Sequence, residues 1–236
     1  MQPARTVPSI VRGIVAHLEA HGSPEHAAGV QWFFKEEVRS HGWYTADLRR
    51  YARALHKELA ADQPVLLAVA ERLFAGSFLE EKALAVTMLE PSLKRFGRAE
   101  FARFERWLGA VSSWADHDAL AMYLIGPMLL ADPARVKRPL RWAASPGRWR
   151  RRAAAVSLIQ GVRKGLFYDE AVAVTGRLVD DRDDMVQKGL GWLLREWAKH
   201  DPKAALPVLT GIRPRASRLV LRTACEKLGP AQRAGV

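Results

Sequence analysis

Three kinds of side chain that could do chemistry together stand at Trp114, Asp118 and Arg152. An indole face can bind a cation or a flat ring, a guanidinium can hold phosphate, and a carboxylate can stabilise positive charge in a transition state. A purely structural interpretation also exists, in which Asp116 caps a helix from about Asp118 to Leu130. Capping accounts well for Asp116 and only in part for Asp118. It leaves unexplained why an aromatic, a carboxylate and an arginine coincide in an otherwise basic protein.

Positive charge is concentrated in one part of the chain. The 236 residues include 37 Lys and Arg against 25 Asp and Glu, for a net charge of +12. Residues 133–168 contain no acid and ten basic residues, which leaves +2 for the other 200 residues. The ten are Arg135, Lys137, Arg138, Arg141, Arg148, Arg150, Arg151, Arg152, Arg163 and Lys164. A smaller basic group follows at Arg213, Arg215, Arg218 and Arg222.

This charge pattern predicts a surface for a polyanion, with nucleic acid as the first candidate. A membrane surface is the weaker candidate, because the basic residues do not lie opposite an apolar face rich in Phe and Leu. The number and placement of the tryptophans also favour nucleic acid as the partner. Eight tryptophans are many for this length, and core packing accounts for most of them, but Trp142 and Trp149 alternate with arginines. Indole faces pack on sugars and bases while guanidinium groups hold phosphates.

Several other classes of protein lack support. The single cysteine, Cys225, excludes internal disulfides and a thiolate zinc cluster. No apolar run approaches the length that spans a bilayer, and the first residues show no secretory signal. No HExxH, Walker loop or GxGxxG is present. His17 and His21 have the spacing of a metal clamp but no third ligand nearby, so they are interpreted as a solvated helix end. Neither a metal nor a cofactor is expected.

Nearly every periodic stretch has helical spacing, which predicts an all-α fold. The expected helices are 10–20, 26–39, 47–59, 65–74, 80–93, 99–108, 119–130, 150–160, 169–178, 185–197 and 217–228. Gly, Pro and Ser clusters lie between them, and no alternating β-branched run or hairpin signal occurs.

The helices also resemble one another at intervals of about 35 residues. The segments that begin at Glu81, Arg151 and Gln187 each pair polar or basic residues with small or apolar ones. Their basic positions are 82, 152 and 188, and half of the first interval of 70 predicts a fourth position at residue 117, which is His117. This period is typical of a HEAT-like α-solenoid of stacked helix pairs with a concave basic groove. Equivalent positions on that groove would be Lys82, Asp118, Arg152 and Lys188. One domain is expected over residues 1–236, with loose ends at 1–8 and 229–236.

At these positions the sequence resembles the AlkD family of DNA alkylation-repair glycosylases, which have HEAT-like repeats. Trp114 with Asp118 matches the family's aromatic–carboxylate pair, and residues 149–154, WRRRAA, match its W-x-x-R-A-A segment. The longest match is at residues 187–199, QKGLGWLLREWAK, which resembles the family's Q-K-x-x-G-W-x-L-R-E-[YW] helix. The likeness covers roughly residues 31–228.

The resemblance implies a monofunctional glycosylase that removes cationic N-alkylated purines, such as 7-methylguanine and 3-methyladenine, without deep base flipping. Alkylation already weakens the glycosidic bond, so the enzyme must stabilise oxocarbenium character and position a water molecule. The family's catalytic residues would fall on Trp114, Asp118, Arg152 and Trp192, with Arg152 keeping Asp118 ionised. DNA-binding residues would be Lys82, Arg148, Trp149, Arg150, Arg151, Lys188, Arg215 and Arg218. No lysine suggests a Schiff-base lyase, so strand cleavage is not expected.

One departure from the family concerns the segment between the two site residues. Members often read W-D-x-V-D, whereas this chain has Ala115, Asp116 and His117 between Trp114 and Asp118. The spacing of tryptophan and carboxylate is kept, while the fit to the substrate could differ.

The expected partner is double-stranded DNA with alkylated purines, bound by a monomer in the bacterial cytoplasm and associated with the nucleoid. Bulkier adducts are further candidate substrates. One alternative is a HEAT-repeat protein that binds damaged or distorted DNA without catalysis, and another is a repeat scaffold for an acidic protein. Loss of excision in Asp118→Asn with binding kept would separate the enzyme from both, and steep salt dependence of duplex binding disfavours the scaffold.

Overall fold

The computed structural model describes residues 6–236. These residues form helices and connecting turns, and a single bridge joins the backbones of Arg39 and Phe78. The predicted all-α class is therefore confirmed. Residue contacts divide the chain into two compact units, unit 1 at residues 1–124 and unit 2 at residues 125–236.

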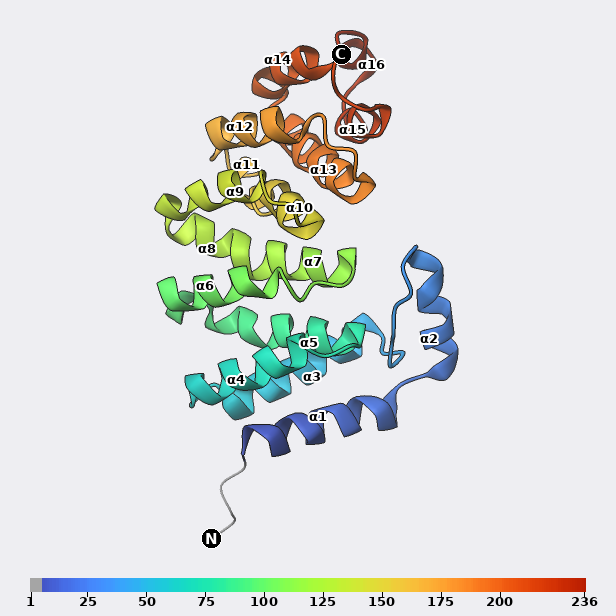
Figure 1. The fold of residues 1–236 in the computed structure, drawn as a ribbon, viewed down its shortest axis with the longest axis vertical. Coiled ribbons are helices and arrows are strands. Elements are labelled where there is room, and N and C mark those ends of the chain that lie inside the picture. Colours follow the sequence, from blue (N-terminus) through green and yellow to red (C-terminus); the bar gives the residue numbers. More distant parts are fainter. Residues whose placement is uncertain (1–5) are drawn as a thin grey trace. The chain divides into compact units, whose positions relative to one another are not determined.

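Unit 1 stacks its helices in two layers (Figure 1). The helices α3, α5 and α7 pack on one another in chain order, and α1 packs on α4. Their apolar faces bury a core that includes Leu18, Leu66, Phe74, Leu84 and Phe104. The bounds are α1 (Val7–His21), α2 (Pro24–Val30), α3 (Thr45–Leu59), α4 (Gln63–Phe74), α5 (Leu79–Leu89), α6 (Arg98–Trp107) and α7 (Trp114–Leu120). Two 3-10 turns cover Gln31–Phe33 and Glu90–Arg95.

Unit 2 repeats this arrangement, with α10, α13 and α15 packed in succession and α9 packed on α12. Gly191 lets α13 and α15 approach closely, since a Cβ there would lie 2.7 Å from the Cβ of Thr223. The bounds are α8 (Gly126–Ala131), α9 (Lys137–Trp142), α10 (Arg148–Val156), α11 (Ile159–Val162), α12 (Tyr168–Leu178), α13 (Asp184–His200), α14 (Pro202–Ile212), α15 (Arg218–Ala224) and α16 (Pro230–Ala234). A 3-10 turn covers Pro133–Val136. Packing of each helix on its neighbours along the chain is consistent with a helical solenoid.

Some helix predictions were wrong, and the short helix α9 was not expected. The helix expected at 26–39 ends at Val30 and gives way to a 3-10 turn and an extended segment, because the Gln31 side chain bonds the backbone of Phe34, Glu36 and Val38. The helix α14 was not predicted at all. Its Pro202 was interpreted as a helix breaker, but it lies in the first turn of α14. Backbone N–H groups in a first turn have no partner within the helix, so a proline there costs no hydrogen bond.

Other helix boundaries also differ from the prediction. The helix expected at 80–93 is α-helical only to Leu89, and the one expected at 150–160 is divided between α10 and α11. Of the ends expected to be loose, residues 1–5 lie outside the described residues, while Val7 and Pro8 already belong to α1 and residues 230–234 form α16.

A buried carboxylate shapes the loop that leads into α3. Glu80, 5% exposed at the start of α5, accepts hydrogen bonds from the Ser40 hydroxyl at 2.5 Å and from the backbone N–H groups of His41, Gly42 and Trp43 at 2.8, 3.1 and 3.3 Å. The loop thus wraps around one carboxylate, which holds Trp43 in place. Gly42 has φ +78° and lies against the backbone of residue 23, so only glycine fits there.

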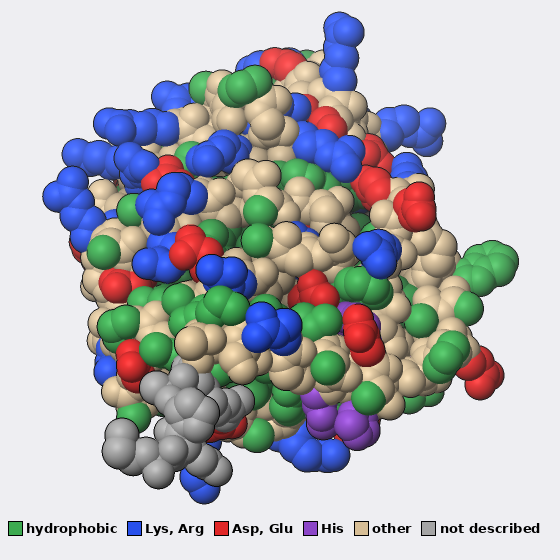
Figure 2. Space-filling model, turned by 60° about the horizontal axis from the view of Figure 1, so that its bottom comes forward, with side chains coloured by type: hydrophobic (Ala, Val, Ile, Leu, Met, Phe, Trp, Pro, Cys, Tyr) green, Lys and Arg blue, Asp and Glu red, His purple; other side chains and the backbone are tan. Residues whose placement is uncertain are grey.

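The surface is rich in Lys and Arg. In the space-filling view these side chains gather toward the upper left, with acids among them, and a group of histidines lies at the lower edge (Figure 2). By sequence, unit 1 contains 15 Lys and Arg with 15 Asp and Glu, whereas unit 2 contains 22 and 10. The whole net charge of +12 therefore belongs to unit 2.

Candidate functional site

The candidate site begins with the capped first turn of α7. Ser113 is the N-cap, and its N–H and hydroxyl both donate to Asp116 Oδ1, at 2.7 and 2.5 Å. The other carboxylate oxygen, Oδ2, accepts from the Ser112 backbone at 2.8 Å. The helix therefore starts earlier than predicted, at Trp114, and Asp116 is the third-residue partner of a capping box rather than the cap itself. Asp116 is fully buried and serves the fold.

Lys82 lies beneath this turn, inside unit 1. Its ammonium donates to the carbonyls of Phe74 at 2.9 Å and Ala110 at 2.7 Å, and lies 3.7 Å from Asp116 Oδ2. Burial lowers the pKa of Lys82, while the charges of Asp116 and Glu81 oppose that shift. With a side chain only 4% exposed, Lys82 offers no surface to DNA, which corrects the expected binding role. Lys82 points into unit 1, where it is bonded to the backbone of neighbouring segments.

Asp118 follows Asp116 by two residues in α7, but unlike Asp116 it is partly exposed. Its side chain is 18% exposed, and its Oδ1 lies 2.7 Å from Nδ1 of His117, whose own side chain is fully buried. An ionised carboxylate can only accept, so the Nδ1–H of His117 donates to it. The residue that departs from the family pattern thus holds the candidate catalytic carboxylate from inside the core. The sequence analysis did not foresee this contact.

Trp114 shares the exposed side of α7 with Asp118. The two residues are four apart in one helix, so they lie one turn apart on the same face. The Trp114 indole stacks on the ring of Phe34, with centroids 5.0 Å apart and planes at 16°. Phe34 follows the 3-10 turn at 31–33, in the segment expected to be helical. No sequence signal connected Phe34 to this tryptophan, because the contact spans 80 residues.

A π-helical segment, Ala121–Ile125, follows α7 directly. Pro127 lies in the first turn of the next helix, α8, and a proline cannot donate the backbone hydrogen bond that a regular α-helix would need there. Single π-helical turns are frequent next to functional sites.

In unit 2, Arg152 lies on α10 and packs against α13. Its side chain lies in the interior, and the residue is 5% exposed. The guanidinium donates to the carbonyl of Met185 in the first turn of α13 at 2.5 Å. Gly189 makes room for it, since a Cβ at that position would lie 3.0 Å from Arg152 Cγ. Arg152 thus ties α10 to α13, and its catalytic role stays a prediction.

Trp192 and Lys188 lie one turn apart on α13. Trp192 is half-buried, and Lys188 is 40% exposed with its ammonium 3.3 Å from Asp184. The predicted catalytic residues therefore fall in two groups. Trp114 and Asp118 come together on α7 of unit 1, while Arg152 and Trp192 belong to unit 2.

The expected DNA-binding residues of unit 2 differ in how they are engaged. Arg151 is bound within the unit, to Asp181 at 2.6 Å and to two backbone carbonyls. Arg215 is half-exposed and pairs with Asp180, which lowers the pKa of that carboxyl. Arg148 lies over the ring of Trp149, with 4.6 Å from its guanidinium carbon to the ring centroid. Arg150 is half-buried and Arg218 is exposed.

The described residues hold no group of three or more His, Cys, Asp or Glu side chains that could bind a metal ion. Within the same residues, no helix is both long and apolar enough to cross a membrane.

Comparison with known proteins places these features in a family. Residues 14–228 match the family model of DNA alkylation repair enzymes. The chain belongs to that family. Its fold is similar to a solved structure described as a predicted DNA alkylation repair enzyme from Enterococcus faecalis, with a TM-score of 0.81 and 18% identity over 89% of this chain and 97% of the other. No curated protein sequence matches. Membership in the family supports a role in alkylation repair.

Proposed function

We propose that this protein is a monofunctional DNA glycosylase that removes cationic N-alkylated purines from double-stranded DNA. The observation that carries the proposal is the arrangement on α7. A partly exposed carboxylate, Asp118, is held at 2.7 Å by buried His117 and stands one turn from the indole of Trp114, which is itself backed by Phe34.

The reaction needs little from a general acid. The alkylated base carries a positive charge, so it leaves with the electron pair of the bond between C1′ and nitrogen and becomes neutral. Water then forms a bond to C1′ and gives up a proton, and an abasic site remains. Asp118 would stabilise the oxocarbenium character of the sugar and orient this water, because a carboxylate can do both. The indole of Trp114 would pack against the deoxyribose of the cationic lesion.

The roles of the unit 2 residues follow from the family resemblance. Trp192, half-buried on α13, is proposed as a second indole that contacts the lesion, and Arg152 on α10 as a further residue that supports the reaction. The excess of 12 positive charges in unit 2 supports phosphate binding, which would position duplex DNA without reading its sequence. Arg148, Arg150, Lys188, Arg215 and Arg218 are the proposed phosphate contacts.

The test is release of 7-methylguanine from duplex DNA at low salt by the wild type and by Asp118→Asn. We expect the variant to lose about a hundredfold or more in rate while it binds the duplex as before. Asp169→Asn is the matched control, because it removes an exposed carboxylate from the first turn of α12 and should change nothing. Equal release by both variants would contradict the role of Asp118. Duplex binding without release by the wild type would favour the alternative of a non-catalytic DNA-binding protein.

A further inference from the structure

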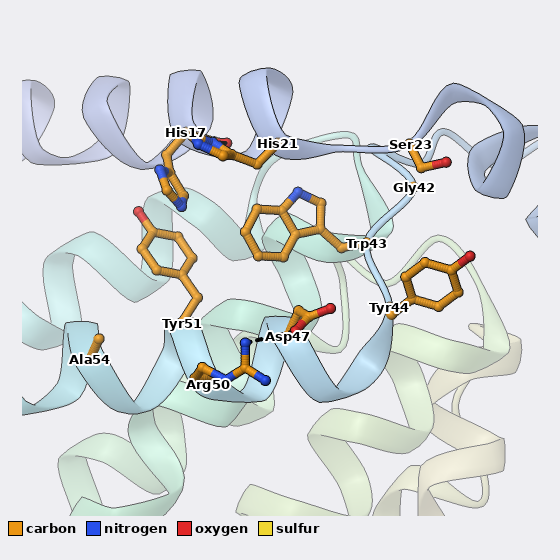
Figure 3. Close-up of a pocket in the computed structure, with 10 residues that line it drawn as sticks. All are labelled: His17, His21, Ser23, Gly42, Trp43, Tyr44, Asp47, Arg50, Tyr51 and Ala54. Atoms are coloured by element: carbon orange, nitrogen blue, oxygen red, sulfur yellow. Dashed lines mark hydrogen bonds and ion pairs between the residues drawn. The ribbon is translucent and has the colours of Figure 1, made fainter.

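A pocket of about 470 Å³ opens in unit 1 at the C-terminal half of α1 and the N-terminal half of α3 (Figure 3). This volume lies in the range of pockets that take small organic molecules. The site described above uses none of its residues. They are His17, His21, Ser23, Gly42, Trp43, Tyr44, Asp47, Arg50, Tyr51 and Ala54.

Aromatic rings belong to half of the residues that line the pocket. Figure 3 shows Trp43 at the centre, with Tyr51 and Tyr44 on either side and the two histidines of α1 above it. The ring centroids of Trp43 and Tyr51 lie 5.8 Å apart with planes at 26°, and His17 lies 4.4 Å from Tyr51. These are faces on which a flat ring can stack.

The central indole is held rigidly. Its Nε1–H donates to the carbonyl of Leu18 at 2.9 Å, and its backbone N–H belongs to the loop that Glu80 binds. The edge of the ring is thus committed to the fold, so a ligand would contact this indole through the part of its face that Tyr51 and His17 do not cover. A preorganised stacking surface costs little ordering on binding.

The histidines of α1 form another part of the wall. Burial and the charge of neighbouring His21 lower the pKa of His17, so its imidazole is neutral near pH 7. The His21 Nδ1 lies 2.9 Å from the carbonyl of His17 and donates to it. The pair that the sequence suggested as a solvated helix end therefore forms an aromatic edge of this pocket.

Polar groups of α3 lie on the opposite side of the pocket. Asp47 and Arg50 are joined at 2.9 Å, with side chains 47% and 75% exposed. A carboxylate has lone pairs for further donors besides Arg50, and an exposed guanidinium can bind a phosphate. The exposed face of α3 also carries Arg49, Arg53 and Lys57, which raises the local positive potential.

We propose that this pocket binds a purine base that is not stacked in a duplex, with the ring on Trp43, a donor edge on Asp47 and its phosphate on Arg50. Guanine fits best, because its N1–H and N2–H groups donate side by side to one carboxylate. Purines offer more stacking area than pyrimidines. The same chemistry occurs in a free nucleotide and in an unpaired base of a DNA strand. This proposal does not depend on the proposed glycosylase activity, because the pocket lies wholly within unit 1.

The experiment is isothermal titration calorimetry of the full chain with dGMP, deoxyguanosine, dTMP and choline. We expect dGMP to bind more tightly than deoxyguanosine or dTMP. Tyr44→Ala, which alters a side chain that is 59% exposed, should weaken dGMP binding about tenfold. Arg50→Ala should abolish the advantage of dGMP over deoxyguanosine. A guanine-containing single strand and the matched duplex are titrated next, and preference for the strand over dGMP identifies an unpaired base as the source.

Two variants serve as controls. Arg53→Ala removes the same charge from the same helix but does not line the pocket, and Tyr123→Ala removes another exposed tyrosine. Both should bind dGMP like the wild type. Absence of dGMP binding, equal losses in Arg50→Ala and Arg53→Ala, or tighter binding of choline than of dGMP would each overturn the proposal. Asp118→Asn should bind dGMP normally and Tyr44→Ala should release 7-methylguanine normally, so failure of one proposal leaves the other standing.

Discussion

The two units differ in their balance of charge. Unit 1 has equal numbers of acids and bases and buries several of them, as with Lys82 beside Asp116 and Glu80 beneath the loop at 40–43. Unit 2 has 22 bases to 10 acids, and many of its arginines, such as Arg215 and Arg218, face solvent. Buried charges in unit 1 hold segments in place, whereas the surplus in unit 2 remains available to an anion.

This difference bears on the division of work in the proposed enzyme. The candidate carboxylate comes from the neutral unit, where buried His117 holds it on a short helix. A carboxylate among many arginines would be bound by them, as Asp181 is by Arg151. Within unit 1, the contact that the structure describes for the first carboxylate oxygen of Asp118, Oδ1, is made by His117 and not by an arginine.

The largest effect is expected from breaking the buried ion pair of unit 1. Lys82→Met leaves two carbonyls and Asp116 without their cation, which should lower the free energy of unfolding by about 3 kcal/mol. Lys188→Met removes a half-exposed lysine of unit 2 and should cost less than about 0.5 kcal/mol. Urea denaturation of both variants measures this contrast. Similar losses would show that burial does not separate the two units as argued.

A second prediction concerns the contact that holds the candidate carboxylate. His117→Phe fills the buried space but removes the donor to Asp118. We expect the rate of 7-methylguanine release at saturating enzyme to fall about tenfold, because a misplaced group costs catalysis, while duplex affinity stays unchanged. Single-turnover kinetics with a binding titration separates the two quantities. A loss of affinity at unchanged rate would show that His117 supports the fold of the binding surface instead.

Charge removal on the surface should have a smaller effect that differs between the units. Arg218→Ala in unit 2 should reduce the slope of log affinity against log salt for duplex DNA by about 0.9, the value for one phosphate contact. Arg106→Ala removes an exposed arginine from unit 1 and should leave the slope unchanged. Fluorescence anisotropy at several salt concentrations gives both slopes. Equal changes would place DNA on unit 1 as well.

Much of the fold could be predicted from the sequence, because helical periodicity is a local signal. The segment at 31–44 could not, since its apolar run of Trp32, Phe33 and Phe34 imitates a helix. Its real conformation depends on the Gln31 side chain and on Glu80, which lies about 40 residues away. Local spacing carries no information about such a partner.

The candidate site was predictable to a similar degree. The spacing of Trp114 and Asp118 survives in one turn of α7. The contacts that support these residues, Phe34 behind the indole and His117 beside the carboxylate, depend on packing that no motif records. The sequence placed Lys82 on the groove because it recurs at a repeat position, but the structure buries it. A residue type can recur in a repeat because it packs in the core as well as because it binds a ligand.

The smallest effect tests whether ion pairs of unit 2 stabilise the fold at all. Burial acts to raise the pKa of Glu196, but the hydrogen bond and charge of Arg163, with Arg195 and Lys199, outweigh it and hold that pKa below its ordinary value of 4.5. The folded-state pKa is depressed, so the pair stabilises the protein fully above pH 4.5 and loses that contribution as the pH falls through the lower value.

Arg163→Ala should therefore lower the free energy of unfolding by about 1 kcal/mol or less at pH 7. The gap from the wild type should shrink as the pH falls below 4.5, because protonated Glu196 no longer needs the arginine. Lys164→Ala, an exposed neighbour, is the control and should show no gap at either pH. Thermal unfolding across this range makes the comparison. A gap that persists in acid would mean that Arg163 acts through the packing of its stem, and the arginines of unit 2 would then contribute to stability as well as to binding.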